Sequence, residues 1–451
     1  MSQAAIWIKN PLAIFAQDSD GGIVIKGQKI IELVPLGARP KSQIDEVYDA
    51  SGSVLLPGLI NTHHHFYQTL TRAYPEALNK ELFPWLKSLY KVWANIQPEM
   101  LAVSTELALS ELLLSGCTTA SDHHYLFPNQ LENAIDIQVE EAKKIGMRVV
   151  LTRGSMSLGE KDGGLPPQSV VQTKEQILTD SERLIKAYHD SEEGAMTQIA
   201  LAPCSPFSVT TDLMIETAEL AQQYDVRLHT HLAETIDEEN FCLDKFGLRT
   251  VDYLESVGWL SDRTWLAHGI HFNKEEIQKL GKSGVGICHC PSSNMMLASG
   301  ICHSLELEEA GSIIGLGVDG SASNDGSNMI AELRQAMYLQ RLRYGASKIT
   351  HHHAYDWATK GSAALLGRTD IGEISIGKQA DLALFKLDEL RFSGSHDSLA
   401  ALLLCGAQKA DRVMIAGEWR VVDGKIVGKD EAELMSRHSN AAKKLRQLAN
   451  V

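Results

Sequence analysis

The sequence predicts an α/β fold, a (β/α)8 TIM barrel with a small β-sandwich domain formed by the two chain ends. Short apolar runs alternate with amphipathic segments through the middle of the chain, and further strand-like runs occur near both ends. Continuous apolar strands that alternate with helices form parallel sheets, and eight such units match a TIM barrel. The chain has 451 residues, 44% of them hydrophobic, which is enough for more than one compact domain.

The strand-like runs at the two ends are each too short to make a domain alone. Glycine and proline separate these runs, which span residues 5–9, 22–25, 29–34, 380–385, 412–417 and 420–424. We therefore expect both ends to pair in one composite β domain, made of residues 1–56 and 371–451, with the barrel of residues 57–370 inserted between them. Residues 430–450 are charged with periodic apolar positions, which predicts a surface helix at the end of the chain.

Each apolar run of the middle region is expected to form one barrel strand. The first run, residues 53–56, leads into a motif at 57–65 that is rich in histidine. The other runs span residues 117–123, 147–153, 198–204, 226–231, 264–268, 285–289 and 313–319. Amphipathic segments such as 98–115 and 131–145 lie between the runs and predict the helices that cover the barrel.

Composition limits the partners and the compartment. The net charge of −15 argues against a nucleic-acid partner, because an acidic surface repels phosphate. No apolar run is long enough to span a membrane, and the first residues do not resemble a signal peptide. The seven cysteines indicate reduced thiols in a cytoplasmic protein. The sequence leaves open whether the chain forms a homo-oligomer.

Polar side chains stand at the ends of several predicted strands, where the residues around them are apolar. They are His63 and His65 after the first strand, then His231, His268 and Asp319. The carboxyl ends of TIM-barrel strands carry the active site, and alternate residues of a strand share a face. Three histidines and one aspartate suit zinc, with iron(II) as the alternative. The pattern therefore predicts a metal site at this end of the barrel.

The residues around this site indicate hydrolytic chemistry. Such a metal lowers the pKa of a bound water to about 7. Glu234 is either a proton shuttle beside that water or an acid that stabilises a helix N-terminus. His268 is expected either to donate a hydrogen bond to the attacking oxygen or to stabilise it electrostatically, and Asp319 to accept the proton of the attacking water. Residues 200–206 contain no lysine or acid that could bridge a second ion, which predicts a single metal.

Several motifs resemble the amidohydrolase superfamily, in its branch of mononuclear deaminases and chlorohydrolases. They lie at residues 57–65, 231–234, 266–268, 317–324 and 372–382, so the resemblance covers nearly the whole chain. It implies one zinc ion per subunit, with iron(II) as the alternative. The metal ligands it implies are His63, His65, His231 and Asp319. The residues to which it gives acid–base or orienting roles are Glu234 and His268.

The resemblance also implies the reaction. Residues 64–72, 82–87, 121–128 and 151–159 are similar to bacterial deaminases that act on 8-oxoguanine. We therefore expect a small purine-like substrate, with 8-oxoguanine converted to uric acid and ammonia. The alternatives are deamination or aminohydrolysis of a hydroxytriazine, a pterin or guanine, and a non-catalytic scaffold on the same barrel.

Four residues are predicted to contact the substrate. Gln68 falls where guanine deaminases of the superfamily carry a purine-binding glutamine, and its amide can both donate and accept. Tyr125, Arg153 and Cys204 end strands two, three and four. Arg153 either holds a substrate carbonyl or forms a structural ion pair. Residues 204–207 replace the Arg-Phe pair expected in guanine deaminases, which argues against plain guanine as the best substrate.

Overall fold

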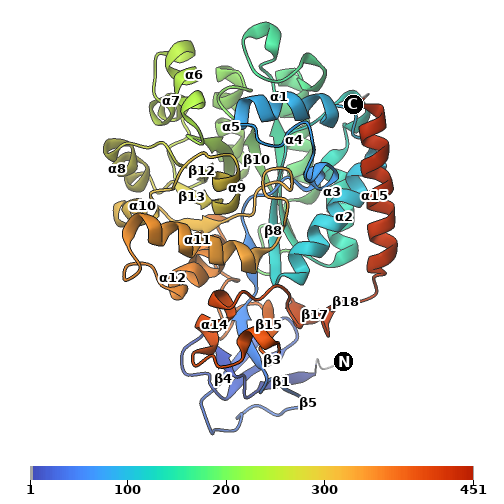
Figure 1. The fold of residues 1–451 in the computed structure, drawn as a ribbon, viewed down its shortest axis with the longest axis vertical. Helices are drawn as coiled ribbons and strands as arrows, with labels where there is room; N and C mark the ends of the chain where they lie inside the picture. Colours follow the sequence, from blue (N-terminus) through green and yellow to red (C-terminus); the bar gives the residue numbers. More distant parts are fainter. Residues whose placement is uncertain (1–3, 450–451) are drawn as a thin grey trace.

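The computed structural model describes residues 4–449, and its largest part is a barrel of eight parallel strands (Figure 1). The strands follow one another around the barrel in chain order, which confirms the predicted TIM-barrel class. They are β7 (Leu59–Asn61), β8 (Cys117–His124), β9 (Arg148–Ser155), β10 (Thr197–Pro203), β11 (Leu228–Leu232), β12 (Thr264–His268), β13 (Gly286–His289) and β14 (Ile314–Leu316).

The barrel closes between its last strand and its first. The Thr62 amide donates to the Leu316 carbonyl at 2.9 Å, just beyond the ends of the two strands. One step further on, the Asp319 amide donates to the His63 carbonyl at 3.1 Å. The closing hydrogen bonds therefore bring His63 and Asp319 side by side, although 256 positions separate them in the sequence.

Helices surround the barrel wall (Figure 1). They are α1 (Leu82–Trp93), α2 (Pro98–Leu114), α3 (Ala134–Ile145), α4 (Lys174–Tyr188), α5 (Thr211–Tyr224), α6 (Ile236–Phe246), α7 (Thr250–Ser256), α8 (Lys274–Lys282), α9 (Pro291–Met296), α10 (Ser304–Ala310), α11 (Met329–Tyr344), α12 (His351–Asp356) and α13 (Ser362–Leu365), with a π-helical turn at Trp357–Gly361. The helices predicted at 98–115 and 131–145 are confirmed as α2 and α3. Among residues 4–449, no helix combines the length and the apolar character that crossing a bilayer requires.

Two further sheets contain the strands of the chain ends. One has the order β4-β3-β1-β5 and the other β18-β17-β16-β15-β6-β2. The first consists of β1 (Ala5–Lys9), β3 (Gly22–Lys26), β4 (Lys29–Val34) and β5 (Glu46–Asp49). The second consists of β2 (Ala13–Ile14), β6 (Ser53–Pro57), β15 (Leu382–Lys386), β16 (Arg412–Ile415), β17 (Glu418–Val422) and β18 (Lys425–Ile426), and α14 (Ser398–Leu404) lies in the same part of the chain.

The two chain ends meet in the second sheet, where β6 pairs antiparallel with β15. In Figure 1 these sheets lie together below the barrel. A domain division at residues 56/57 and 370/371 remains a prediction.

The prediction that the apolar run at residues 53–56 begins the first barrel strand is wrong. This apolar run forms β6 of the terminal sheet, and the first barrel strand is the separate, three-residue β7. The chain changes sheets at Gly58, where a Cβ atom would lie 2.1 Å from the Thr118 Oγ1 of the neighbouring barrel strand. Only glycine permits so close an approach, and this break separates two runs that look continuous in the sequence.

The predicted terminal helix is confirmed as α15 (Glu431–Leu448), which runs along the side of the barrel (Figure 1). Lys429 and Arg437 both pair with the buried Glu106 of α2, each at 2.7 Å. His438 Nε2 lies 3.0 Å from Thr69 Oγ1, in the short helix η1 (Phe66–Thr71) that also contains Gln68. The end of the chain thus packs against a segment that lines the site described next.

Candidate metal centre

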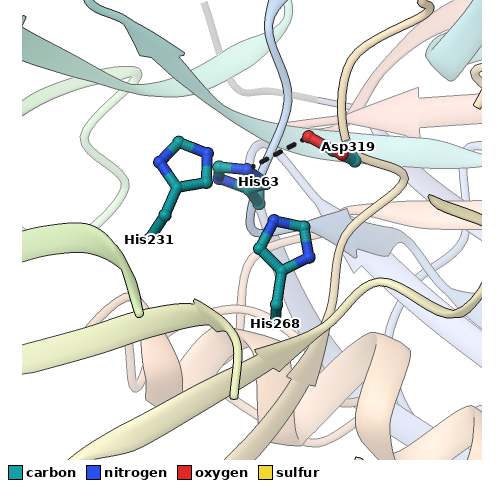
Figure 2. A group of neighbouring side chains, drawn as sticks. All are labelled: His63, His231, His268 and Asp319. Carbon is teal, nitrogen blue, oxygen red and sulfur yellow. Dashed lines mark ion pairs between the residues drawn. The ribbon is translucent and has the colours of Figure 1, made fainter. Parts of the chain in front are cut away.

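The predicted ligands converge at the carboxyl end of the barrel strands, and Figure 2 shows His63, His231 and Asp319 among them, together with His268. The Nε2 atoms of His63 and His65 lie 3.2 and 3.3 Å from Asp319 Oδ1. The His231 Nε2 atom lies 3.3 Å from His65 Nε2. His268 joins the group, since its ligand atom lies within 4.8 Å of those of His63, His231 and Asp319. All five side chains are buried.

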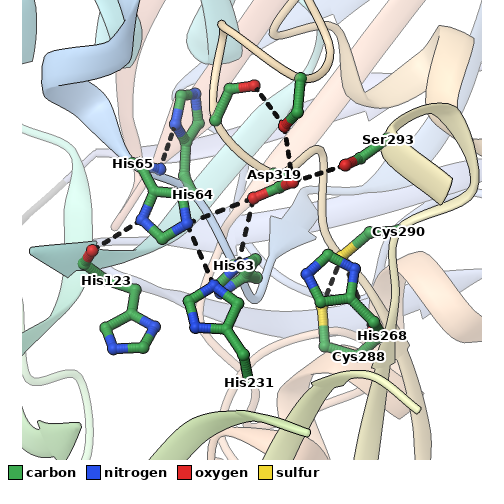
Figure 3. Close-up of polar contacts among 12 residues, drawn as sticks. His63, His64, His65, His123, His231, His268, Cys288, Cys290, Ser293 and Asp319 are labelled. Atoms are coloured by element: carbon green, nitrogen blue, oxygen red, sulfur yellow. Dashed lines mark hydrogen bonds and ion pairs between the residues drawn. The ribbon is translucent and has the colours of Figure 1, made fainter. Parts of the chain in front are cut away.

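The rings of His63, His65 and His231 gather around the Asp319 carboxylate (Figure 3). His65 Nδ1 lies 2.7 Å from the carbonyl of His123, and His231 Nδ1 lies 2.7 Å from the carbonyl of Cys204. Because a carbonyl only accepts, each Nδ1 carries the proton and each Nε2 presents a lone pair. Carbonyls that fix the second nitrogen of a histidine in this way are typical of metal ligands.

The electrostatics of the cluster fit a bound cation. Among the described residues, His63 Nε2 and Asp319 Oδ1 are buried atoms with no hydrogen-bond partner, although they lie close together. A cation between them would satisfy both atoms. Burial lowers the pKa of His231 to about 3 and that of His63 well below its usual value, so both rings are neutral, which is the form that binds metals.

Two serines fix the orientation of the Asp319 carboxylate. Ser293 Oγ and Ser323 Oγ donate to Oδ2 at 2.6 and 2.7 Å, which leaves Oδ1 to face the histidines. Asp319 itself has a φ of 61° and His268 a φ of 72°, left-handed conformations that are rare outside glycine. The sequence predicted a role for neither serine. Ser293 lies on α9, after a different barrel strand from Asp319, and the sharp turn that brings Ser323 back to Asp319 leaves no local pattern.

Glu234 and His268 form a second polar pair beside the cluster. Glu234 Oε2 lies 3.5 Å from His268 Nε2, while His268 Nδ1 lies 3.0 Å from Asn294 Oδ1. Burial and the nearby charge of Asp319 raise the pKa of Glu234 to about 8, so its carboxyl group holds a proton near neutral pH. A buried neutral acid beside a metal cluster is suited to proton donation, whereas an acid that stabilises a helix N-terminus would be charged and exposed.

A narrow cavity opens next to these groups, and most of its wall is aromatic or aliphatic. It is lined by His65, Gln68, Leu82, Trp85, Leu86, Tyr90, Tyr125, Cys204, Phe207, His231, Glu234, His268, Leu297, Asp319 and Ser323. Helix α1 covers one side, and its Trp85 donates to the Ala322 carbonyl at 3.1 Å. An apolar cavity with a few convergent polar groups suits a flat heteroaromatic ring.

Three of the four predicted substrate residues line this cavity: Gln68, Tyr125 and Cys204. Gln68 Oε1 accepts from the Ala322 amide at 3.3 Å, so its amide nitrogen remains available to another acceptor. The fourth residue, Arg153, lies elsewhere, and its predicted substrate contact needs correction. Its Nε atom pairs with Asp180 at 2.9 Å and its guanidinium stacks on Phe127, so the geometry is that of the structural ion pair.

A second group of histidines reaches beneath the cluster and includes His123 and His229, for which the sequence predicted no role. The donor atoms of His63, His123 and His229 lie within 4.8 Å of one another, all buried. The signal that could have revealed His229 is its spacing from His231, because residues two apart on a strand share a face.

Three curated relatives match nearly the full chain. The 8-oxoguanine deaminase of Pseudomonas aeruginosa is 67% identical over 97% of this chain and 98% of its own. An isoxanthopterin deaminase from an unknown prokaryotic organism is 33% identical, with 91% and 89% covered. The hydroxydechloroatrazine ethylaminohydrolase of a Pseudomonas species is also 33% identical, with 92% and 88% covered.

Solved structures agree with these relatives. The zinc complex of atrazine chlorohydrolase from Arthrobacter aurescens TC1 has a TM-score of 0.91 and 30% identity, covering 97% of this chain and 100% of that one. A zinc-bound adenosine deaminase from Xanthomonas campestris has a TM-score of 0.87 and 26% identity, covering 99% of each chain. The amidohydrolase family model matches residues 54–420. The resemblance seen in the sequence motifs is thereby confirmed, and the chain belongs to the amidohydrolase family.

Proposed function

We propose that this chain catalyses the metal-dependent hydrolytic deamination of an aminopurine, with 8-oxoguanine as substrate and uric acid and ammonia as products. The observation that carries the proposal is that His65, His231, His268 and Asp319 of the cluster line one narrow, largely apolar cavity together with Glu234 and Gln68. The choice of substrate is supported by the relative named 8-oxoguanine deaminase, which is 67% identical to this chain.

The proposed cofactor is one zinc ion per subunit, with iron(II) as the alternative. His63, His65, His231 and Asp319 would hold it, because their lone pairs face one point and two of those atoms lack hydrogen-bond partners within residues 4–449. When bound, such a metal lowers the pKa of a coordinated water to about 7 and supplies hydroxide at neutral pH. A single ion is supported at strand β10, since residues 200–206 offer no lysine or acid to bridge a second.

The side chains beside the ligands would then move the protons. Glu234, protonated in its buried position, donates to a ring nitrogen of the substrate and makes the neighbouring amino-bearing carbon more electrophilic. Asp319 accepts the proton of the attacking water, and His268, held by Asn294, orients the attacking oxygen. Asp319 then passes the proton it accepted to the amino group, which leaves as ammonia, and Glu234 regains a proton from the added hydroxyl group as that group becomes the product carbonyl.

The polar edge of the purine would meet Gln68, whose side chain is fixed by the Ala322 amide. Tyr125 and Cys204 complete that wall of the cavity. A pterin and a hydroxytriazine are the second candidates, because relatives named for isoxanthopterin and for hydroxydechloroatrazine are each 33% identical to this chain. Guanine fits less well, since residues 204–207 lack the Arg-Phe pair of guanine deaminases.

Steady-state assays would test this choice of substrate. We expect kcat/KM for ammonia release to be highest with 8-oxoguanine, ahead of guanine, isoxanthopterin and hydroxyatrazine. Alkylamine release from an N-alkylated hydroxytriazine should be measured in parallel, because it separates aminohydrolysis from deamination. A higher kcat/KM for any other member of this panel, or no ammonia from a zinc-loaded preparation, would contradict the proposal.

The setting proposed for the enzyme is the cytoplasm. The seven cysteines are all free thiols in the structure, six of them buried, as suits a reducing compartment. A small molecule is the only partner that the proposed reaction requires. The proposed metal site does not require a homo-oligomer, because a single chain supplies all the proposed ligands.

A further inference from the structure

One ligand in the cluster is held differently from the others. The Nδ1 atoms of His65 and His231 face backbone carbonyls, which no substitution of their parent residues would remove. His63 Nδ1 instead lies 2.8 Å from the Nε2 atom of His229. The orientation of His63 therefore depends on another side chain.

His229 lies one layer deeper in the barrel than the metal cluster. It shares a face of β11 with His231, two residues away, and is completely buried. Its ring stacks on Trp265 of the next strand, with a centroid distance of 4.3 Å and an interplanar angle of 12°. Trp265 in turn donates from Nε1 to the Thr62 carbonyl at 3.2 Å, directly before His63. These contacts form a closed ring that holds His229 in one position.

The Trp265 carbonyl determines which atoms donate in the hydrogen bonds of His229 and His63. His229 Nδ1 lies 2.9 Å from the Trp265 carbonyl, which can only accept. His229 Nδ1 therefore carries the proton, and its Nε2 presents a lone pair. His63 Nδ1 must donate to that lone pair, which leaves the His63 Nε2 lone pair directed at Asp319.

We propose that His229 is a positioning residue that fixes the tautomer and the ring orientation of His63, and thereby slows the loss of the bound metal. This inference rests on the proposed metal site. Within the described part of the chain, His231 lines the substrate cavity and His229 does not, so His229 is expected to act through His63 alone. Partners of this kind typically change metal affinity by about 10- to 100-fold.

The experiment measures how fast zinc leaves the zinc-loaded full chain into a chromogenic chelator. His229→Gln places an amide oxygen near the position of Nε2, where it can accept from His63. His229→Asn reaches only as far as Nδ1 and the Trp265 carbonyl. Both variants keep a buried polar group, so the comparison between them isolates the bond to His63. His289→Asn is the matched control, because His289 is also buried on a barrel strand but bonds to Gln340.

We expect His229→Asn to release zinc about tenfold faster than the unmodified chain, and His229→Gln and His289→Asn to stay within about threefold of it. Equal release rates for the Asn and Gln variants of His229 would overturn the inference. A measured stoichiometry near two would also overturn it, because a cation between His63 and His229 would replace the hydrogen bond. An unmodified chain that binds no zinc would refute the proposed function itself, and the inference with it.

Discussion

At the scale of single residues, the site works by giving chemically identical atoms different surroundings. The two oxygens of Asp319 face two serines on one side and the histidines on the other. Glu234 and Asp319 are both buried carboxyl groups, yet burial raises the pKa of Glu234 to about 8, whereas the close approach of His63 and His65 outweighs burial and holds the pKa of Asp319 well below its usual range. One acid can thus donate a proton while the other binds a cation.

Replacing Glu234 tests the first of these roles. Glu234→Gln keeps the shape and polarity of the side chain but removes its acidic proton, so we expect kcat to fall by about 10²- to 10⁴-fold. Zinc content should remain that of the unmodified chain, because Glu234 is not among the proposed ligands. The measurements are steady-state ammonia release and metal analysis of the same preparation. Full activity in this variant would show that the proton comes from another group.

The ligands could be predicted from the sequence because each is a polar residue at the end of an apolar run, and TIM-barrel geometry places those ends together. Ser293 and Ser323 could not be predicted, because Ser293 lies on α9, after a different barrel strand from Asp319, and the sharp turn that brings Ser323 back to Asp319 leaves no local pattern. His229 shares a strand face with His231, but its contact with His63 in another part of the chain is not visible in the sequence. Arg153 shows the converse: it follows an apolar run, but Asp180 on α4 turns its side chain away from the cavity.

At the scale of elements, buried ion pairs join loops to strands. Arg368 and Asp370 form such an ion pair in the segment after α13. Asp370 also accepts a hydrogen bond from the Gly194 amide at 2.7 Å, close to the start of β10. Burial would raise the pKa of Asp370, but the hydrogen bonds from Arg368 and Gly194 outweigh it and lower the pKa to about 2. The ionised carboxylate is therefore what the fold stabilises.

The ion pair between Arg368 and Asp370 should make a pH-dependent contribution to stability. The pKa of Asp370 falls from an ordinary 3.8 to about 2 on folding, which corresponds to about 2 kcal/mol. That stability is present above pH 3.8 and is lost as the pH falls toward 2. Asp370→Asn should therefore lower the free energy of unfolding by about 2 kcal/mol at pH 7 and by progressively less below pH 4. Urea denaturation across this range measures it, and a pH-independent difference would contradict the assignment.

One boundary between strands could not be predicted from the sequence. Alternation of apolar runs and amphipathic segments was sufficient for the barrel and for α2, α3 and α15. It did not reveal that β6 and β7 are two separate strands, because the break consists of one glycine whose necessity comes from Thr118 on another strand. Close approach between two strands depends on the tertiary structure, which a local sequence pattern does not encode.

At the scale of the whole molecule, the barrel and the terminal sheets are joined by a buried ion pair. Arg148, at the start of β9, pairs through Nε with Asp381 at 2.9 Å, and both side chains are almost completely buried. Asp381 also accepts from the Ala416 amide at 2.8 Å in the terminal sheet. One carboxylate thus links a barrel strand to the sheet that contains both chain ends.

Removing this carboxylate should be costly. Asp381→Ala leaves the guanidinium of Arg148 buried without its counter-ion, which typically costs about 3–5 kcal/mol. We expect a matching loss in the free energy of unfolding, with kcat unchanged below the unfolding transition, because the pair lies at the opposite end of the barrel strands from the site. The double variant Arg148→Met with Asp381→Ala should recover part of the loss. No recovery would show that the charge of Arg148 is not the cause.

The central claim is that one cation, held by His63, His65, His231 and Asp319, is required for turnover. The most direct test is to strip the protein of metal with a chelator and titrate zinc back while following ammonia release from 8-oxoguanine. We predict that activity is absent from the stripped protein and rises in proportion to zinc, reaching its plateau at one equivalent per chain. Full activity without added metal, or a plateau only at two equivalents, would contradict the account.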